Sequence, residues 1–168
     1  MKSTTVIETI KHLSENTKIT AFSSFILSQT RAGILPDYLN IDLMEVPRLV
    51  PHVFVLDVLN SSEKLLIKYC GTKIDEFYGC NMTGKYAVDY YQGTESFTEI
   101  EAMFWQGIRE KKPTYTVRSV HLENERVNKF KVAETIMFPC STDTKTINYA
   151  IGLADFFNAP LIESRASR

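Results

Sequence analysis

The sequence predicts an α+β fold, a five-stranded antiparallel sheet with helices on one face, preceded by N-terminal helices. Helical periodicity fills the N-terminal part, two β-branched runs begin at Val53, and three further strand patterns follow one longer helix. The 168 residues suffice for one domain with a buried core. We expect an N-terminal helical extension over 1–34, the main domain over 35–158 and a C-terminal tail over 159–168.

The N-terminal extension carries two helical patterns. Thr5 and Glu8 have the spacing of a capping box, and apolar residues then recur on one face until about residue 16. A second apolar-periodic segment covers 19–33, with Gly33 where a left-handed cap is expected. Both helices have apolar faces, which either cover the sheet of the same chain or pair with a second copy.

The next segment changes from proline-broken turns to strands. Pro36, Pro47 and Pro51 permit only short, kinked helical pieces. From Val53 to Cys70, two apolar runs flank a polar Asn-Ser-Ser turn and predict a hairpin. In its second run, alternation predicts that Leu65, Ile67 and Tyr69 all face the core.

The remaining elements follow the same local rules. A short helix over 71–79 is predicted to end at Gly79, a second short one lies around 83–91, and a longer helix covers 94–113. Acidic residues lead the longer helix and basic residues close it, as the helix dipole favours. Three strands complete the predicted sheet, over 114–122, 130–138 and 147–157.

Three quoted stretches carry a resemblance to a known family. In chain order they are LPDYLNIDLMEVPRLVPHVFVLDV, IKYCGTKIDEFYGCNMTGKY and AETIMFPCSTDTKTINYAIGLADF. Together they resemble a family of short bacterial proteins with a single PAS domain and no fused output domain, over roughly 35–156. The resemblance implies a PAS-like sheet and a sensing or protein-interaction module that is usually dimeric. It implies no catalytic residue.

The composition of the chain argues against a nucleic-acid partner, a membrane span and an oxidising compartment. Nineteen basic against twenty acidic residues give no basic footprint for nucleic acid. The most apolar run is too short to span a bilayer, and the N-terminus lacks the apolar core of a signal peptide. Three cysteines without a close pair argue against a disulfide framework. We therefore expect a cytoplasmic protein.

Cys80 is the residue that most resembles a reactive centre. Flavin-binding photosensor PAS domains place the reactive cysteine after an asparagine, in a motif of the type N-C-R-F-L-Q. Here the order is reversed, Cys80 before Asn81, and the rest of the motif is missing. The stretch instead predicts a loop between two short helices, with positive φ at Gly79 and Gly84 and the cysteine as a small apolar filler.

The sequence gives little indication of a metal site, a haem site or a catalytic site. The three histidines, His12, His52 and His121, lie on separate predicted elements, and no C-x-x-C spacing occurs. The long helix has no histidine for a haem, although Met103 is a soft ligand. No nucleophile motif, phosphate loop or HExxH is present. The cofactor is therefore left open, with flavin and haem disfavoured, and no catalytic residue is assigned.

A small-ligand pocket between sheet and helices is the remaining candidate site. A fully packed aromatic core explains the same residues. Arg118, His121 and Glu134 are the candidate polar elements. Glu134 requires a partner or a ligand if it points inward, and is an ordinary surface acid if it points outward. The predicted lining comprises Tyr69, Phe77, Tyr78, Tyr86, Phe104, Trp105, Val117, His121, Val132 and Glu134.

The sequence thus predicts a PAS-type sensory or signalling module that binds a small ligand, a partner protein or both, as a homodimer. The first alternative is an interaction adaptor with a filled core and no ligand. The second is a small enzyme that uses His121 and a carboxylate as an acid–base pair.

Overall fold

The structure is a computed structural model of the whole chain, and the following account describes residues 9–10, 12, 14–31, 35–90, 95–124 and 127–158. Side chains at 90, 95–98, 122–124 and 127–130 are not part of this description. The α-helices are α2 (Thr17–Ser28), α3 (Thr72–Tyr78) and α4 (Glu95–Glu110). The 3₁₀ turns are η1 (Tyr38–Asn40), η2 (Leu43–Glu45), η3 (Val50–His52) and η4 (Ala87–Tyr90). The strands are β1 (Val53–Asp57), β2 (Leu66–Cys70), β3 (Thr114–Asn124), β4 (Val127–Cys140) and β5 (Tyr149–Phe157).

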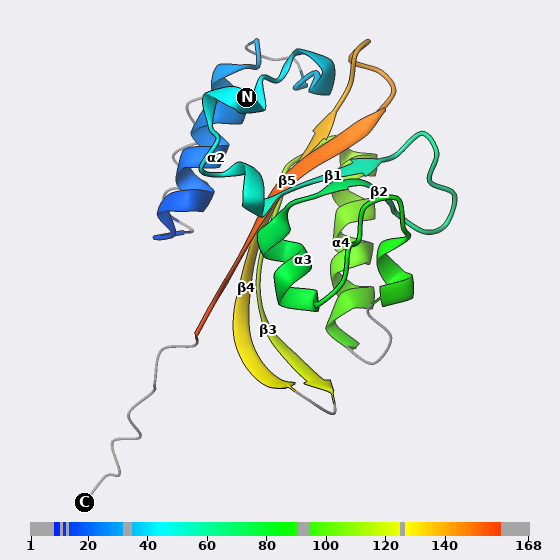
Figure 1. Cartoon of the computed structure of the whole chain (residues 1–168). Coiled ribbons are helices and arrows are strands. Elements are labelled where there is room, and N and C mark those ends of the chain that lie inside the picture. The colour runs from blue at the N-terminus through cyan, green and yellow to red at the C-terminus, as the bar shows by residue number, and fades with distance from the viewer. Residues whose placement is uncertain are drawn as a thin grey trace, which may run out of the picture.

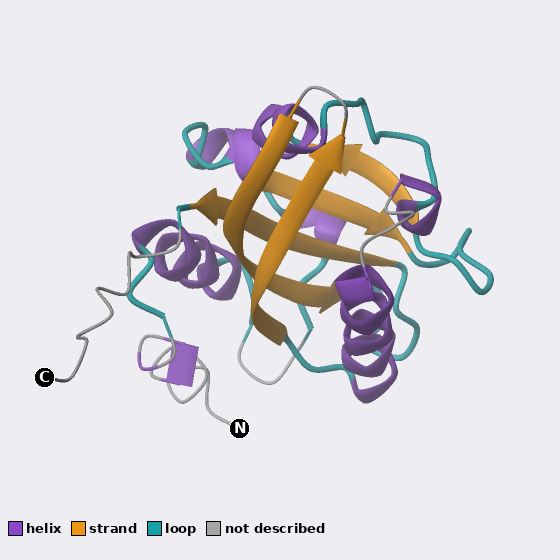
Figure 2. Cartoon of the chain, turned by 90° about the horizontal axis from the view of Figure 1, so that it is seen from below, coloured by secondary structure: helices purple, strands orange, loops and turns teal. Residues whose placement is uncertain are grey.

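The five strands form one antiparallel sheet in the order β2-β1-β5-β4-β3, which confirms the predicted fold class. Helices α3 and α4 lie on one face of this sheet, and α2 lies on the other (Figure 1). Seen from below, helices stand on both sides of the sheet (Figure 2). We call the face toward α3 and α4 the inner face and the face toward α2 the outer face.

Each face has its own apolar cluster, because successive residues of a strand point to opposite sides. Phe54 and Leu56 of β1 belong to the inner cluster, together with Phe104 of α4. Val53 and Val55 of the same strand belong to the outer cluster, together with Phe22 of α2. All five residues of β1 are therefore buried, as a strand covered on both faces requires.

Helix α2 settles the alternative left open for the second N-terminal helix, because it packs on the sheet of its own chain. Ile19, Phe22 and Ile26 are completely buried in the outer cluster. The helix begins at Thr17 after an Asn16 cap and ends at Ser28, earlier than the predicted end at Gly33, which lies outside the described residues.

Little of the first N-terminal helix is described. Residues 9, 10 and 12 are helical, and Ile10 is buried in the outer cluster. The predicted capping box of Thr5 and Glu8 lies outside the described residues.

One prediction of side-chain direction in β2 is wrong. Val55 pairs with Tyr69 but Leu56 pairs with Ile67, so Lys68 is an extra residue in the ladder, a β-bulge. The bulge reverses the alternation: Ile67 lies in the inner cluster, whereas Tyr69 packs against the outer cluster. Tyr69 therefore does not face the same side as Leu65 and Ile67.

The helices between β2 and β3 agree with their local sequence. Helix α3 ends at Gly79 with φ +73°, and Gly84 has φ +80°, so both glycines supply the predicted left-handed conformations. Helix α4 buries Ile100, Phe104 and Ile108 in the inner cluster, as their spacing predicted. The strands β3 and β4 extend beyond the predicted bounds toward their connecting turn.

Candidate functional site

The inner face holds a small cavity between the sheet and helices α3 and α4. Its volume is about 50 Å³, and its wall is almost entirely apolar. Three of the predicted pocket residues, Tyr78, Phe104 and the polar candidate Arg118, line it. The Phe104 ring stacks on Phe54 at 5.8 Å between centroids. The full lining is Phe54, Leu56, Leu65, Ile67, Cys70, Ile74, Tyr78, Met82, Ala87, Ile100, Phe104, Arg118, Thr135, Ala154 and Phe156.

Polar groups gather on the β3–β4 side of this cavity. Arg118 donates from its guanidinium to the hydroxyl of Tyr78 at 3.1 Å, and Thr135 lines the same wall. Thr116 pairs directly with Thr135 across the two strands, so both side chains point to the inner face. Within the described part of the chain, the buried hydroxyl oxygen of Thr116 has no hydrogen-bond partner, which leaves a place for a water or a polar ligand atom.

The described cavity does not fit a flavin or a haem. Sites for ligands of drug size have volumes of roughly 300–1,000 Å³, several times the 50 Å³ found here. Cys80 is half-buried in the loop after α3 and packs at the edge of the inner cluster. Burial raises the pKa of its thiol, so Cys80 is present mainly as the less nucleophilic protonated form at neutral pH.

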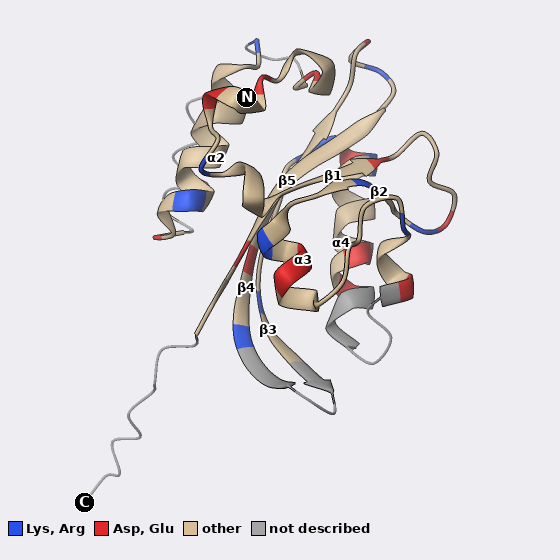
Figure 3. Cartoon of the chain, in the orientation of Figure 1, with Lys and Arg blue, Asp and Glu red and all other residues tan. Residues whose placement is uncertain are grey.

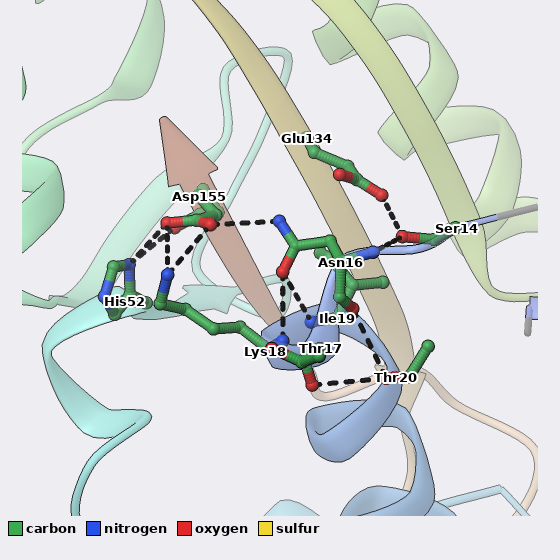
Figure 4. A network of polar contacts seen from close by, with 10 residues as sticks. Ser14, Asn16, Thr17, Lys18, Ile19, Thr20, His52, Glu134 and Asp155 are labelled. Carbon is green, nitrogen blue, oxygen red and sulfur yellow. Dashed lines mark hydrogen bonds and ion pairs between the residues drawn. The ribbon is translucent and has the colours of Figure 1, made fainter. Parts of the chain in front are cut away.

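The outer face holds a polar network where the segment before α2 meets strands β4 and β5, at Ser14, Asn16, Lys18, His52, Tyr115, Glu134 and Asp155. We call these seven residues the polar junction; Figure 4 shows six of them. Asp155, only 6% exposed, is its centre. Its carboxylate accepts from Asn16 Nδ2 at 2.9 Å and from Lys18 Nζ at 3.1 Å.

Asn16 has a double role in the polar junction. Its Oδ1 accepts from the backbone N–H of Lys18 at 2.9 Å and from that of Ile19 at 3.5 Å, which caps α2. Its Nδ2 donates to Asp155. One side chain therefore both starts the helix and ties it to β5.

Glu134 lies beside Asp155, because the two residues are direct partners across β4 and β5. It is buried and accepts from the hydroxyls of Ser14 and, at 2.7 Å, Tyr115. Burial, together with this bond, raises the pKa of Tyr115 to about 12, so its hydroxyl remains a donor at neutral pH. Glu134 is thus buried with hydrogen-bond partners and is not a surface acid, but its side chain lies on the outer face of the sheet, away from the cavity.

His52 completes the polar junction from the turn that precedes β1. Its Nδ1 lies 3.3 Å from the carbonyl oxygen of Ala154 and 3.4 Å from Asp155 Oδ1. Burial lowers the pKa of His52, and the negative charge of Asp155 opposes this shift only in part. The neutral imidazole is therefore favoured in the folded protein, with Nδ1–H donating to these acceptors.

A groove of about 520 Å³ runs along the polar junction, lined by residues 14–17 and by side chains of β3, β4 and β5. A second hollow of about 210 Å³ lies on the other side of Asp155, beside His52, Lys73 and Lys131. Asp155 contributes to both, so the junction is accessible at its margins although its carboxylates are buried.

The predicted ligand residues do not form one site. Tyr69 lies on the outer side of β2, and Phe77 stacks on Phe156 at 3.9 Å in a separate small cluster. Trp105 packs at the border of the inner cluster. Four other predicted residues lie outside the cavity and are more accessible to solvent: Tyr86, Val117 and His121 are exposed, and Val132 is half-buried. Their role in ligand binding remains a prediction.

Glu134 is not the carboxylate of the hypothetical acid–base pair with His121. His121 pairs with Phe130 and Glu134 with Val117, so the two residues lie four positions apart along the β3–β4 hairpin. At about 3.4 Å per residue this is roughly 14 Å, beyond the reach of a hydrogen bond.

Sequence reasoning missed most of the polar junction. No role is predicted from the sequence for Ser14, Asn16, Lys18 or Asp155: the first helix is only expected to end near residue 16, and Asp155 lies in the strand expected over 147–157. Only the isolated acids within the apolar strand patterns, Glu134 and Asp155, gave a readable signal, because a buried carboxylate needs partners.

Comparison with solved structures shows that the chain has the PAS fold. The match to a light-oxygen-voltage domain studied with a flavin analogue covers 73% of this chain and 87% of that domain's chain, at 12% identity and a TM-score of 0.52. The PAS domain of a protein from Colwellia psychrerythraea matches 69% of this chain and 97% of its own, at 10% identity and a TM-score of 0.51. The match to the Rhodobacter sphaeroides LOV protein covers 86% of this chain and 68% of the LOV protein, at 10% identity and a TM-score of 0.50.

No protein-family model and no curated protein sequence matches the chain. In the described residues, no helix has both the length and the apolarity needed to cross a membrane. The same residues contain no cluster of three or more histidine, cysteine or acidic side chains arranged to hold a metal ion.

Proposed function

We propose that this protein is a sensory or signalling module of the PAS class, whose output is the movement of helix α2 on the outer face of the sheet. The observation that carries this proposal is the polar junction at the start of α2. Asp155 holds Asn16 and Lys18, while Glu134 holds Ser14. The signal passes to a separate partner protein that meets the outer face.

The packing of α2 has two parts that differ in chemistry. Ile19, Phe22 and Ile26 bury the middle of the helix against the sheet. Its start, in contrast, depends on buried carboxylates and on His52, whose protonation or partners can change. A helix with a firm apolar contact and a polar, titratable anchor is suited to switching between two packed states.

Hydrogen exchange of the full chain tests this proposal. We expect the amides of α2 to exchange through a local opening that leaves α4 protected. Asp155→Asn removes the charge but keeps the size, so it should speed exchange in α2 at least several-fold and leave α4 unchanged. Exchange of α2 only by global unfolding, in both proteins, would refute the proposal, because α2 would then have no separate motion.

A small ligand in the inner cavity is a second candidate input. It is supported by the buried hydroxyl of Thr116 and by the Arg118–Tyr78 pair at the cavity wall. The volume of about 50 Å³ admits a ligand of only a few heavy atoms or one or two waters, which favours the interaction module over a large-cofactor sensor. A native mass spectrum of the fresh protein would reveal any bound mass above that of the chain.

We further propose a homodimer, which forms through the part of the outer face that α2 leaves uncovered. Val117 of β3 is 58% exposed there, and isologous dimers are the commonest oligomers. Light scattering should give a dimer for the wild type and for Leu59→Asp, an exposed apolar position elsewhere, and a monomer for Val117→Asp. A monomeric wild type would refute the dimer.

The three free cysteines support a cytoplasmic location, since a reducing compartment keeps thiols unpaired. Catalysis is not part of the proposal. Neither is nucleic-acid binding, because the net charge is −1.

A further inference from the structure

The connection between α2 and β1 contains a five-residue repeat. Residues 37–41 read Asp-Tyr-Leu-Asn-Ile and residues 42–46 read Asp-Leu-Met-Glu-Val. Each unit begins with an aspartate, continues with two large apolar residues and a polar one, and ends with a β-branched residue. Each unit also forms a 3₁₀ turn, η1 in the first and η2 in the second.

The aspartates fix the backbone of both turns in the same way. Asp37 Oδ1 accepts from the backbone N–H of Leu39 at 3.1 Å, and Asp42 Oδ1 accepts from that of Met44 at 2.9 Å. The side chain two positions after each aspartate is thereby held on an ordered backbone.

Within each unit, alternate apolar residues point in opposite directions. Tyr38 and Leu43 pack against the outer cluster, as do Ile41 and Val46 at the ends of the units. The Tyr38 ring lies 4.9 Å from that of Tyr149, between centroids. These four inward residues hold both turns on the domain.

The outward residues are Leu39 and Met44, which we call the outward pair. Leu39 is 70% exposed and Met44 is 78% exposed, the two highest values among the exposed large apolar side chains of the described residues. Single exposed apolar residues are ordinary. Two that occupy equivalent positions of a repeated, capped turn form a preorganised contact, because little conformational entropy remains to be lost on binding.

Charge distinguishes the possible occupants of this surface. Residues 35–46 contain three acids, Asp37, Asp42 and Glu45, and no basic residue, and one exposed basic residue, Arg48, follows two positions later. Figure 3 shows acidic residues in red and basic residues in blue. Placing the same surface of a second copy on it would juxtapose like charges, which disfavours that contact. A basic partner is favoured instead.

The backbone of the turns restricts the form of the partner. A 3₁₀ turn offers no extended strand edge for β-augmentation, so side chains must make the contact. The Cα atoms of Leu39 and Met44 are five residues apart, hence within about 18 Å. A helix of three turns is about 16 Å long and can reach both with one apolar stripe.

We propose that the outward pair is the docking site for a basic amphipathic helix of another protein. This inference rests on the proposed function, in that it names the surface that meets the signalling partner. Leucine or methionine residues of the partner helix contact Leu39 and Met44, and flanking lysine or arginine residues face the three acids. The surface adjoins α2 in the sequence and shares the outer cluster with it, so movement of α2 can alter its shape.

The test uses a fluorescent 18-residue helical peptide of leucine and lysine, with the leucines on one face, and the full chain. A twin peptide carries glutamate in place of lysine. Anisotropy should show binding of the basic peptide only. Leu39→Ser with Met44→Ser should weaken it at least tenfold, and Leu59→Ser, at the 56% exposed Leu59, should not change it.

A charge variant isolates the contribution of the three acids Asp37, Asp42 and Glu45. Asp37→Asn, Asp42→Asn and Glu45→Gln together keep the capping acceptors, since asparagine also caps, but remove three charges. This variant should weaken binding several-fold and reduce its dependence on salt. NMR shifts induced by the basic peptide in the wild type should centre on residues 37–46.

Several results would overturn this inference. They are equal binding of the basic and acidic peptides, equal loss of binding in the Leu59 control, or NMR shifts centred elsewhere. A change of oligomeric state in the Leu39→Ser/Met44→Ser protein would also overturn it, because the surface would then hold a second copy. If the peptide fails while α2 still opens locally in hydrogen exchange, the inference fails and the proposed function stands.

Discussion

The two faces of the sheet are both buried, yet they are held by different forces. The inner face packs α3 and α4 through apolar contacts around a cavity of about 50 Å³. The outer face packs α2 through an equally apolar centre but fixes the start of that helix with two buried carboxylates. Apolar packing is hard to modulate, whereas charged hydrogen bonds respond to pH and partners. Both faces therefore contribute stability through apolar packing, and we expect the outer face to be the adjustable one.

The largest effects should come from one aromatic ring on each face. Phe104→Ala, on the inner face, should lower the free energy of unfolding by about 3–5 kcal/mol, because a buried phenylalanine leaves a cavity. Phe22→Ala, on the outer face, should cost a similar amount, with the loss concentrated in the hydrogen exchange of α2. Urea denaturation and exchange together measure both. A cost below about 1 kcal/mol for Phe22→Ala would show that the outer face is not packed as described.

The next largest effect should come from the polar junction. Asp155→Ala removes the acceptor of Asn16 and Lys18, and hydrogen bonds to charged groups contribute about 1.5–3 kcal/mol. We expect a loss of about 2 kcal/mol in urea denaturation. The control is Lys64→Ala, which breaks the exposed pair with Asp89 and should cost much less than Asp155→Ala, because solvent screens an exposed pair. Equal costs would remove the distinction between the junction and an ordinary surface pair.

A smaller effect concerns pH. Because burial lowers the pKa of His52, the unfolded chain binds more protons than the folded one between that lowered pKa and the ordinary value near 6.5. The contribution of His52 is therefore complete above this window and is lost as the pH falls through it. The groups that face it are Asp155, Lys18 and Lys73.

Stability measured from pH 7.5 to 5 tests this sign. His52→Gln should flatten the acid-side slope, while His12→Gln, at an exposed histidine, should not. A wild type that gains stability toward pH 5, relative to His52→Gln, would contradict the prediction.

The smallest perturbation uses the cysteines as reporters of each face. Cys70 lies in the inner cluster and Cys140 in the outer one, and burial raises the pKa of both thiols, that of Cys140 to about 12. A thiol reagent should modify half-buried Cys80 first. In a Cys80→Ser background, Asp155→Asn should speed labelling of Cys140 but not of Cys70. If Asp155→Asn sped the labelling of Cys70 and Cys140 equally, the two faces would open together.

The sequence predicted the fold well because its signals are local. Helix α3 follows from a glycine that must adopt positive φ, and α4 from apolar residues at helical spacing. The predicted direction of the Tyr69 side chain was wrong because one extra residue, Lys68, reverses the alternation of side chains in β2 without changing the composition of the strand.

The candidate site was predicted less well. Its contacts join residues far apart in the chain, such as Ser14 and Glu134, which are 120 positions apart. No periodicity encodes such a pair. The cavity was anticipated through Tyr78 and Phe104, but the neighbouring strand residues that complete its wall, such as Ala154 and Phe156, depend on strand register, which one sequence does not fix.

The bond between Asn16 and Asp155 also has a kinetic consequence. It joins positions 139 residues apart, so it closes nearly the whole chain into a loop. Contacts of such high sequence separation form late, after the strands that position them have paired. We expect Asp155→Ala to leave the refolding rate almost unchanged and to accelerate unfolding, a φ-value near zero. The lifetime of the folded state, rather than the speed of its formation, would then depend on this bond.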